Sequence, residues 1–282
     1  LVPAEERHCN TTLEAEVDCD ALGVYKVDDP SYCHNSPLRI LSFDIECAGR
    51  PGCFPDAKHD PVIQIANYVA VQGQAEPLLK NIFNLNTCAP IAGVDVRCFR
   101  TERELLEAWA EFFQQVDPDL VTGYNIVKFD LGYLKDRAEV LKLPGFAYLT
   151  RDNEKKMTVK DATGSSIQTG KRESKEWTLE GRIVFDMYQV IQKDHKLSSY
   201  TLNSVSSHFL GDQKEDVHHS MITKIHQGTK EDRCRLAVYC CKDAYLPIRL
   251  NNGLMSLVGY VEMARVTGVP FSFLLSRGQG VK

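Results

Sequence analysis

The pattern of apolar and polar positions along the chain changes at residue 38. Residues 1–37 are polar and carry no motif. From residue 38 to 45 the chain is densely apolar and β-prone, and residues 62–69 alternate in the way of a second strand. Similar segments predict further strands at 79–85, 94–99, 120–124 and 183–186.

Apolar residues at helical spacing predict helices between and after these strands. Thr101 and Glu104 fit a capping box, so a helix should follow and end at Asp117-Pro118. Four more helices are expected at 130–141, 187–194, 200–210 and 231–260. Strands first, then helices with strands between them, indicate an α/β domain with a mixed central sheet flanked by helices.

Residues 151–181 interrupt this pattern with lysines, glycines and hydroxyl residues. We expect an exposed hairpin or loop here. Between residues 155 and 175 there are six basic and two acidic side chains. A solvated loop and a nucleic-acid contact are both compatible with that charge.

Composition narrows the functional classes. The 282 residues are 43% hydrophobic and 25% charged, which is typical of a globular protein and excludes disorder. No stretch approaches the ~18 apolar residues of a membrane helix. The net charge of −5 provides no positive field for nonspecific DNA binding. Ten cysteines without a C-x-x-C pair do not suggest a disulfide scaffold or zinc.

Two acids lie within the first apolar strand. Asp44 and Glu46 are two residues apart, so their side chains point to the same face of the strand. Buried like charges repel each other, and a divalent metal is the simplest compensation. An edge strand with a solvated polar face is the alternative. The apolar neighbours Phe43 and Ile45 favour a central strand.

Further acids fall in two later segments. Asp130 begins a predicted helix, where a carboxylate taken alone is more typical of a cap. Tyr239 and Asp243 are four apart and share one face of the last predicted helix, although an exposed pair of this kind is common.

Three segments together resemble the exonuclease motifs of family B DNA polymerases in order and spacing. They are residues 43–46 (FDIE), 124–130 (YNIVKFD) and 239–243 (YCCKD). The flanks 42–50, 60–65, 199–203, 208–211 and 262–270 resemble the delta branch of that family. The resemblance extends from about residue 38 to the last residue. Val238 occupies the position where a sister subclass has His.

This resemblance implies an RNase H-like (DnaQ-like) fold and a proofreading 3′→5′ exonuclease that removes mononucleotides from a mispaired DNA end. It also implies two Mg²⁺ ions, which Mn²⁺ should replace. Asp44, Glu46 and Asp243 would hold the first ion. Asp44 would also contact the second, Asp130 would reach it through water, and Tyr239 would orient the attacking water.

The resemblance suggests further contacts. Asn125 and Phe129 would shape the pocket for the terminal nucleotide, although turn and core roles fit them equally. Lys214 would approach the scissile phosphate. The basic segment 155–175 would help to part primer from template. We interpret Asp186 as structural rather than as a metal ligand.

The resemblance also implies an organisation. Residues 1–37 are expected to belong to an N-terminal domain, 38–258 to the exonuclease, and 259–282 to a segment leading to a polymerase core that is missing here. Expected partners are a single-stranded primer 3′ end and, for a full-length nuclear DNA-directed DNA polymerase, primer-template DNA, accessory subunits and a sliding clamp. A catalytically inert RNase H-like module and an RNA exonuclease are the alternatives.

Overall fold

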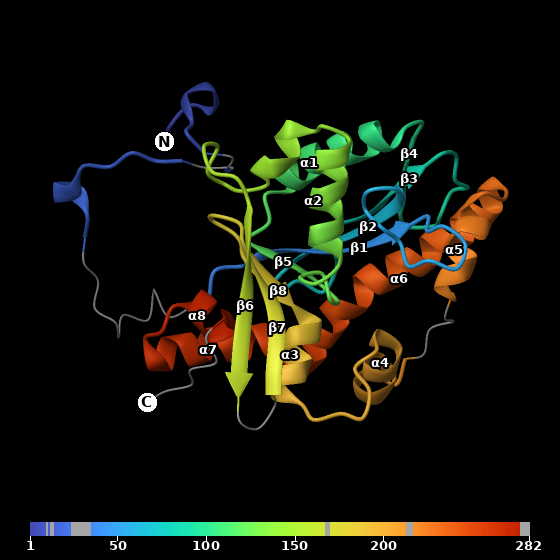
Figure 1. Cartoon of the computed structure of the whole chain (residues 1–282). Coiled ribbons are helices and arrows are strands. Elements are labelled where there is room, and N and C mark those ends of the chain that lie inside the picture. The colour runs from blue at the N-terminus through green and yellow to red at the C-terminus, as the bar shows by residue number, and fades with distance from the viewer. Residues whose placement is uncertain (10, 12–13, 24–34, 167–169, 213–216, 277–282) are drawn as a thin grey trace.

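A mixed sheet forms the centre of the molecule (Figure 1). The computed structural model describes the chain except for residues 10, 12–13, 24–34, 167–169, 213–216 and 277–282. In this described part, six strands pair in the order β4-β3-β2-β1-β5-β8. Their bounds are β1 Arg39–Cys47, β2 Val62–Val71, β3 Leu79–Leu85, β4 Asp95–Phe99, β5 Leu120–Gly123 and β8 Ile183–Asp186. The predicted α/β class and all six predicted strands are confirmed.

Helices cover both faces of this sheet. Their bounds are α1 Glu102–Val116, α2 Asp130–Val140, α3 Met187–Asp194, α4 Leu202–Leu210, α5 His219–His226, α6 Lys230–Leu254, α7 Ser256–Thr267 and α8 Phe271–Ser276. Short 3-10 turns lie at Ala4–Glu6, Cys19–Ala21 and Pro144–Tyr148. None of the described helices combines the length and apolarity that crossing a membrane requires.

The two faces of β1 differ in chemistry. Its odd-numbered residues, including Leu41, Phe43 and Ile45, join the core under α1 and α2. This core is aromatic, and the Phe43 and Trp109 rings are 5.4 Å apart. The even-numbered face carries the two acids. This face packs against α6, which lies on the side of the sheet opposite to α1 and α2 in Figure 1.

Three parallel strands, β1, β5 and β8, end at one edge of the sheet. β5 is short, and its pairing with β1 stops at Ser42 and Thr122. Gly123, the last residue of β5, then allows its backbone to approach β1 and the loop after β5 closely. A Cβ at this position would lie 2.4 Å from Ile126 Cγ2 and 2.6 Å from the carbonyl oxygen of Phe43.

The basic segment forms a hairpin, as predicted. Strands β6 (Thr158–Ser166) and β7 (Gly170–Thr178) pair with each other in a separate two-stranded sheet. Trp177 anchors the base of the hairpin, because its indole nitrogen donates to the carbonyl oxygen of Val127 at 2.9 Å. The hairpin is thus attached to the second motif.

The prediction of one helix over residues 231–260 was wrong. The helix ends at Leu254, and α7 begins again after Met255, which has a left-handed φ of 50°. The side-chain oxygen of Asn251 accepts from the Leu257 amide at 2.9 Å and stabilises this break. Helix α5 was not predicted. The capping box of Thr101 and Glu104 is confirmed.

Replacing Gly123 should destabilise the fold. We expect Gly123→Ala to lower the free energy of unfolding by about 2–3 kcal/mol, because the new methyl group meets backbone that cannot move aside. Urea unfolding measures this loss. Gly145→Ala is the matched control, since nothing lies within 4 Å of a Cβ there, and it should change stability by less than about 0.5 kcal/mol. Equal effects would contradict the close approach.

Candidate metal centre

Asp44 and Glu46 lie on a central strand. β1 pairs with β2 on one side and β5 on the other, which excludes the edge-strand alternative. Their register partners on β2 are Ala66 and Gln64. Glu46 is only 6% exposed, so both the helix above and the sheet below shield its charge from water. Glu46 is therefore set into the protein interior and Asp44 is half-buried, and uncompensated charge in such places is costly.

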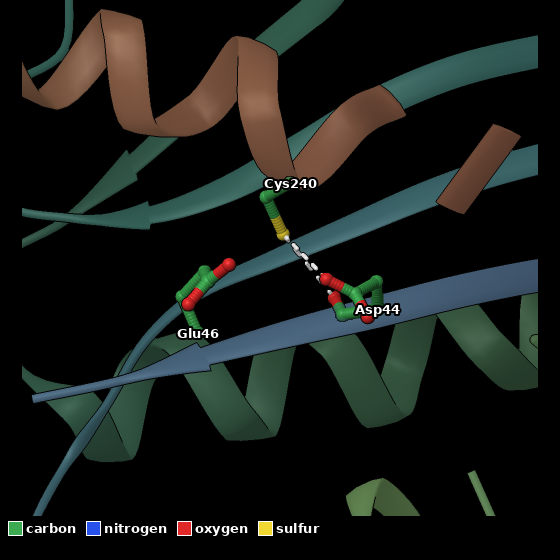
Figure 2. A group of neighbouring side chains, drawn as sticks. All are labelled: Asp44, Glu46 and Cys240. Carbon is green, nitrogen blue, oxygen red and sulfur yellow. Dashed lines mark hydrogen bonds between the residues drawn. The ribbon is translucent and has the colours of Figure 1, made fainter. Parts of the chain in front are cut away.

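Helix α6 adds two side chains to this acidic face. Cys240 is fully buried, and its Sγ is 3.6 Å from Oδ2 of Asp44. One ligand atom each from Asp44, Glu46 and Cys240 lie within 4.8 Å of one another (Figure 2). Burial, together with the charges of the two acids, raises the pKa of the Cys240 thiol well above its usual range. Asp243 follows on the same helix and is 8% exposed.

Asp130 reaches the same region from the opposite side of the sheet. Its Oδ1 accepts from the amide of Ile45 at 3.2 Å, between the two acids of β1. That amide is available because β5 ends before it. Asp130 is the first residue of α2, whose N-cap is Phe129, so its carboxylate serves β1 rather than capping the helix as N-cap.

The electrostatic setting of Asp130 favours a bound cation. Burial, followed by the charges of Asp186 and Asp243, raises the pKa of Asp130 to about 7. A carboxylate that is held partly protonated by its surroundings is stabilised in its charged form by a nearby cation. The oxygen donors present suit a divalent ion of the magnesium type. The residues therefore fit the metal that the sequence predicted.

Asp186 has a structural role, as interpreted from the sequence. It caps α3, and its carboxylate accepts from the amides of Asn125 at 2.8 Å, Val127 at 3.1 Å and Tyr188 at 3.0 Å. Burial raises its pKa to about 6. This one side chain fixes the loop between β5 and α2, and with it the start of the helix that carries Asp130.

Asn125 and Phe129 lie in that loop. Asn125 has a left-handed φ of 68°, and its side-chain oxygen is buried without a hydrogen-bond partner among the described residues. Phe129 is half-buried, and its ring is 5.5 Å from that of Phe54, which is 68% exposed. The loop that leads to Asp130 therefore carries a buried acceptor at Asn125 and a half-buried ring at Phe129 that contacts the exposed ring of Phe54.

Gln64 connects α6 to the sheet. Its amide nitrogen donates to Oδ1 of Asn84 at 2.7 Å and to the carbonyl oxygen of Arg233 on α6 at 2.9 Å. Because Gln64 is paired with Glu46 on the neighbouring strand, this contact ties the position of the helix to the acidic face. Tyr239 lies six residues further along α6 and is half-buried against the cluster of Ile63, Ile222 and Leu236.

Comparison with known proteins now decides the family. The family model described as the DNA polymerase family B exonuclease domain matches residues 2–205. The chain belongs to this family. The DNA polymerase delta catalytic subunit of Oryza sativa subsp. japonica is 61% identical over 247 residues, which are 88% of this chain and 22% of that protein. The subunit of the same name from Caenorhabditis elegans is 51% identical over 282 residues, 100% of this chain and 26% of that protein. The chain thus spans about a quarter of the length of these relatives.

Within this family B exonuclease domain, the structure brings the predicted acids to one region, but their contacts with one another differ. Asp44 and Glu46 form the tight group with Cys240. Asp130 and Asp243 influence each other electrostatically at its border. Lys214 lies outside the described residues. Val238 is 49% exposed on α6, whereas its neighbour Tyr239 is half-buried.

Cys240 is the residue that the sequence did not single out. It stands beside Cys241 in the third motif, and no metal-ligand spacing marks one of them. The helical register alone distinguishes them, because Cys240 is fully buried against β1 and Cys241 is half-buried. A helical projection anchored on Asp243 is the only signal that could have found it.

Removing the Asp186 carboxylate should loosen the second motif of this exonuclease domain. We expect Asp186→Ala to lower the free energy of unfolding by about 3–5 kcal/mol, because it removes a helix cap and leaves two further amides unpaired. Urea unfolding measures the change. Thr201→Ala, which removes only the exposed cap of α4, is the control and should cost about 1 kcal/mol. Equal losses would show that Asp186 is only a cap.

Proposed function

We propose that this chain is the proofreading 3′→5′ exonuclease domain of a delta-type replicative DNA polymerase, releasing 5′-mononucleotides from a mispaired primer end. The observation that carries this proposal is the convergence of acids from three elements. Asp44 and Glu46 come from β1, Asp243 from α6, and Asp130 from α2 through its bond to the β1 amide. Family membership and the names of the relatives support the same activity.

We further propose Mg²⁺ as the natural cofactor at these acids, with Mn²⁺ as a substitute. Carboxylate oxygens are the ligands that both ions prefer. Asp44, Glu46 and Asp243 would hold one ion, and Asp44 and Asp130 the second. Bound divalent ions supply activation of water and stabilisation of charge on the leaving oxygen in phosphodiester hydrolysis.

The protein residues position the reactants. Tyr239 shares a face of α6 with Asp243, so its hydroxyl is a suitable holder for the attacking water. The buried acceptor of Asn125 faces no protein donor in the described part of the chain, which suits a contact with the terminal nucleotide. Phe54 and Phe129 offer aromatic surface for an unpaired base.

The hairpin is a proposed second contact with DNA. Lys160 and Lys175 are exposed on it, and Trp177 joins its base to the motif that carries Asp130. Cations of this kind attract the phosphate backbone. In a full-length parent, a DNA-directed DNA polymerase of the nucleus, the domain would act with primer-template DNA, accessory subunits and a sliding clamp.

The two β1 acids give the most direct test. Combined Asp44→Ala and Glu46→Ala should reduce 3′→5′ digestion of single-stranded DNA with Mg²⁺ roughly 10³-fold or more. Both acids would hold the divalent ion that stabilises the charge of the transition state. In the presence of a chelator, the thermal midpoint of this double variant should equal or exceed that of the wild type, because the repulsion between the two carboxylates is removed. Combined Glu107→Ala and Glu111→Ala on α1 is the control and should leave digestion unchanged. Persistent digestion in the Asp44/Glu46 variant, or a wild type that binds DNA but stays inactive with both Mg²⁺ and Mn²⁺, would refute the proposal.

Asp130 can be tested separately from the β1 acids. Asp130→Asn keeps the size of the side chain but removes its charge, and we expect the rate of digestion to fall about 10²-fold or more while one metal still binds. Single-turnover kinetics and Mn²⁺ titration by calorimetry measure the two effects. Unchanged turnover would limit Asp130 to its structural bond with the Ile45 amide.

A further inference from the structure

The thiol of Cys240 lies against the acidic face of β1 and donates to Asp44. It is fully buried, and Figure 2 shows its sulfur directed toward Asp44, with Glu46 on the other side of the sulfur. Its Sγ lies 3.5 Å from the carbonyl oxygen of Asp44 and 3.6 Å from Oδ2 of the same residue. A soft donor atom therefore lies in contact with a carboxylate that the proposed function assigns to metal binding.

The spacing of these atoms fits a tetrahedral ion. Zinc binds sulfur at about 2.3 Å and carboxylate oxygen at about 2.1 Å, so the tetrahedral angle places the two ligand atoms about 3.6 Å apart. The distance from Cys240 Sγ to Asp44 Oδ2 is 3.6 Å. Asp44, Glu46 and Cys240 each offer one ligand atom that lies within 4.8 Å of the other two. Three protein ligands and one water complete four-coordination at zinc.

We propose that Asp44, Glu46 and Cys240 form a site for a thiophilic divalent cation, Zn²⁺ or Cd²⁺, and that such an ion inhibits the enzyme by displacing Mg²⁺ from the two shared acids. The inhibition rests on the proposed exonuclease function, but the metal site itself does not.

The selectivity follows from the ligand types. Soft sulfur favours Zn²⁺ and Cd²⁺ over Mg²⁺, which keeps oxygen ligands and octahedral geometry. Binding forms one metal–sulfur bond and breaks the S–H bond of Cys240, whose proton passes to the buffer. No oxidation state changes.

Cys240 differs from Cys241 and Cys47 in its position relative to the two acids. Cys241 follows it on α6 but does not belong to the group around the two acids. Cys47 is buried on β1, yet it belongs to the core on the opposite face of the sheet. Among the described cysteines, Cys240 therefore combines full burial with a place in the group formed with Asp44 and Glu46.

Spectroscopy of the whole chain tests the site without any reaction. Co²⁺, a zinc substitute, should give a thiolate-to-cobalt charge-transfer band with the wild type. The band should disappear in Cys240→Ser and in Cys240→Ala, and persist in the control Cys241→Ser. A wild type without the band, or a band that survives both Cys240 variants, would overturn the assignment of sulfur as ligand.

Inhibition gives the second measurement. Zn²⁺ should suppress Mg²⁺-supported digestion of single-stranded DNA, and Cys240→Ser should raise the half-inhibitory Zn²⁺ concentration at least about 10-fold, the smallest loss expected for a ligand. Inhibition of each protein is expressed relative to its own rate of digestion with Mg²⁺ alone. Equal Zn²⁺ sensitivity in wild type and variant would refute the inhibitory role.

The two proposals fail in different ways. A cobalt band with no digestion under Mg²⁺ would keep the metal site and reject the exonuclease function. Digestion that depends on Asp44 and Glu46, without a cobalt band, would keep the function and reject Cys240 as a ligand.

Discussion

Repulsion among buried carboxylates is the constraint on which the rest of this structure depends. Glu46, Asp130 and Asp243 are buried and Asp44 is half-buried, and buried charges cost several kcal/mol apiece when uncompensated. A flexible scaffold would separate them. The aromatic core beneath β1 resists this, because Phe43 and Trp109 pack directly behind the acidic face. Core packing on one side of a strand therefore holds charge together on the other.

Strand topology explains how residues far apart in the chain meet. β1, β5 and β8 run parallel and end at one edge, the place where open α/β sheets collect functional groups. Early termination of β5 frees the Ile45 amide for Asp130, and the end of β8 supplies Asp186 to fix the intervening loop. One short strand thus creates both the bonding site for an acid and the space for the loop that carries it.

Local sequence signals predicted most of this fold and only part of the site. Strand alternation and the capping box at Thr101 are properties of neighbouring residues, so they could be seen directly. The break at Met255 depends on a left-handed backbone and on a hydrogen bond from the Leu257 amide to the Asn251 side chain, which periodicity does not reveal. The proximity of the acids came from family resemblance, since no spacing links β1 to α6. The boundaries at residues 38 and 258 stay a prediction.

The packing of α6 on β1 also explains why a sulfur stands among oxygen ligands. Residue 240 is fully buried where the helix crosses the acidic strand, so only a small side chain fits there. Alanine or serine would meet that limit without adding a soft donor. Cysteine fills slightly more volume and behaves largely as a small apolar group while it is protonated. The cysteine that lets the helix pack closely against the sheet therefore also gives the acids a neighbour suited to thiophilic ions. Under this proposal, the ion that occupies the centre depends on which ions are available.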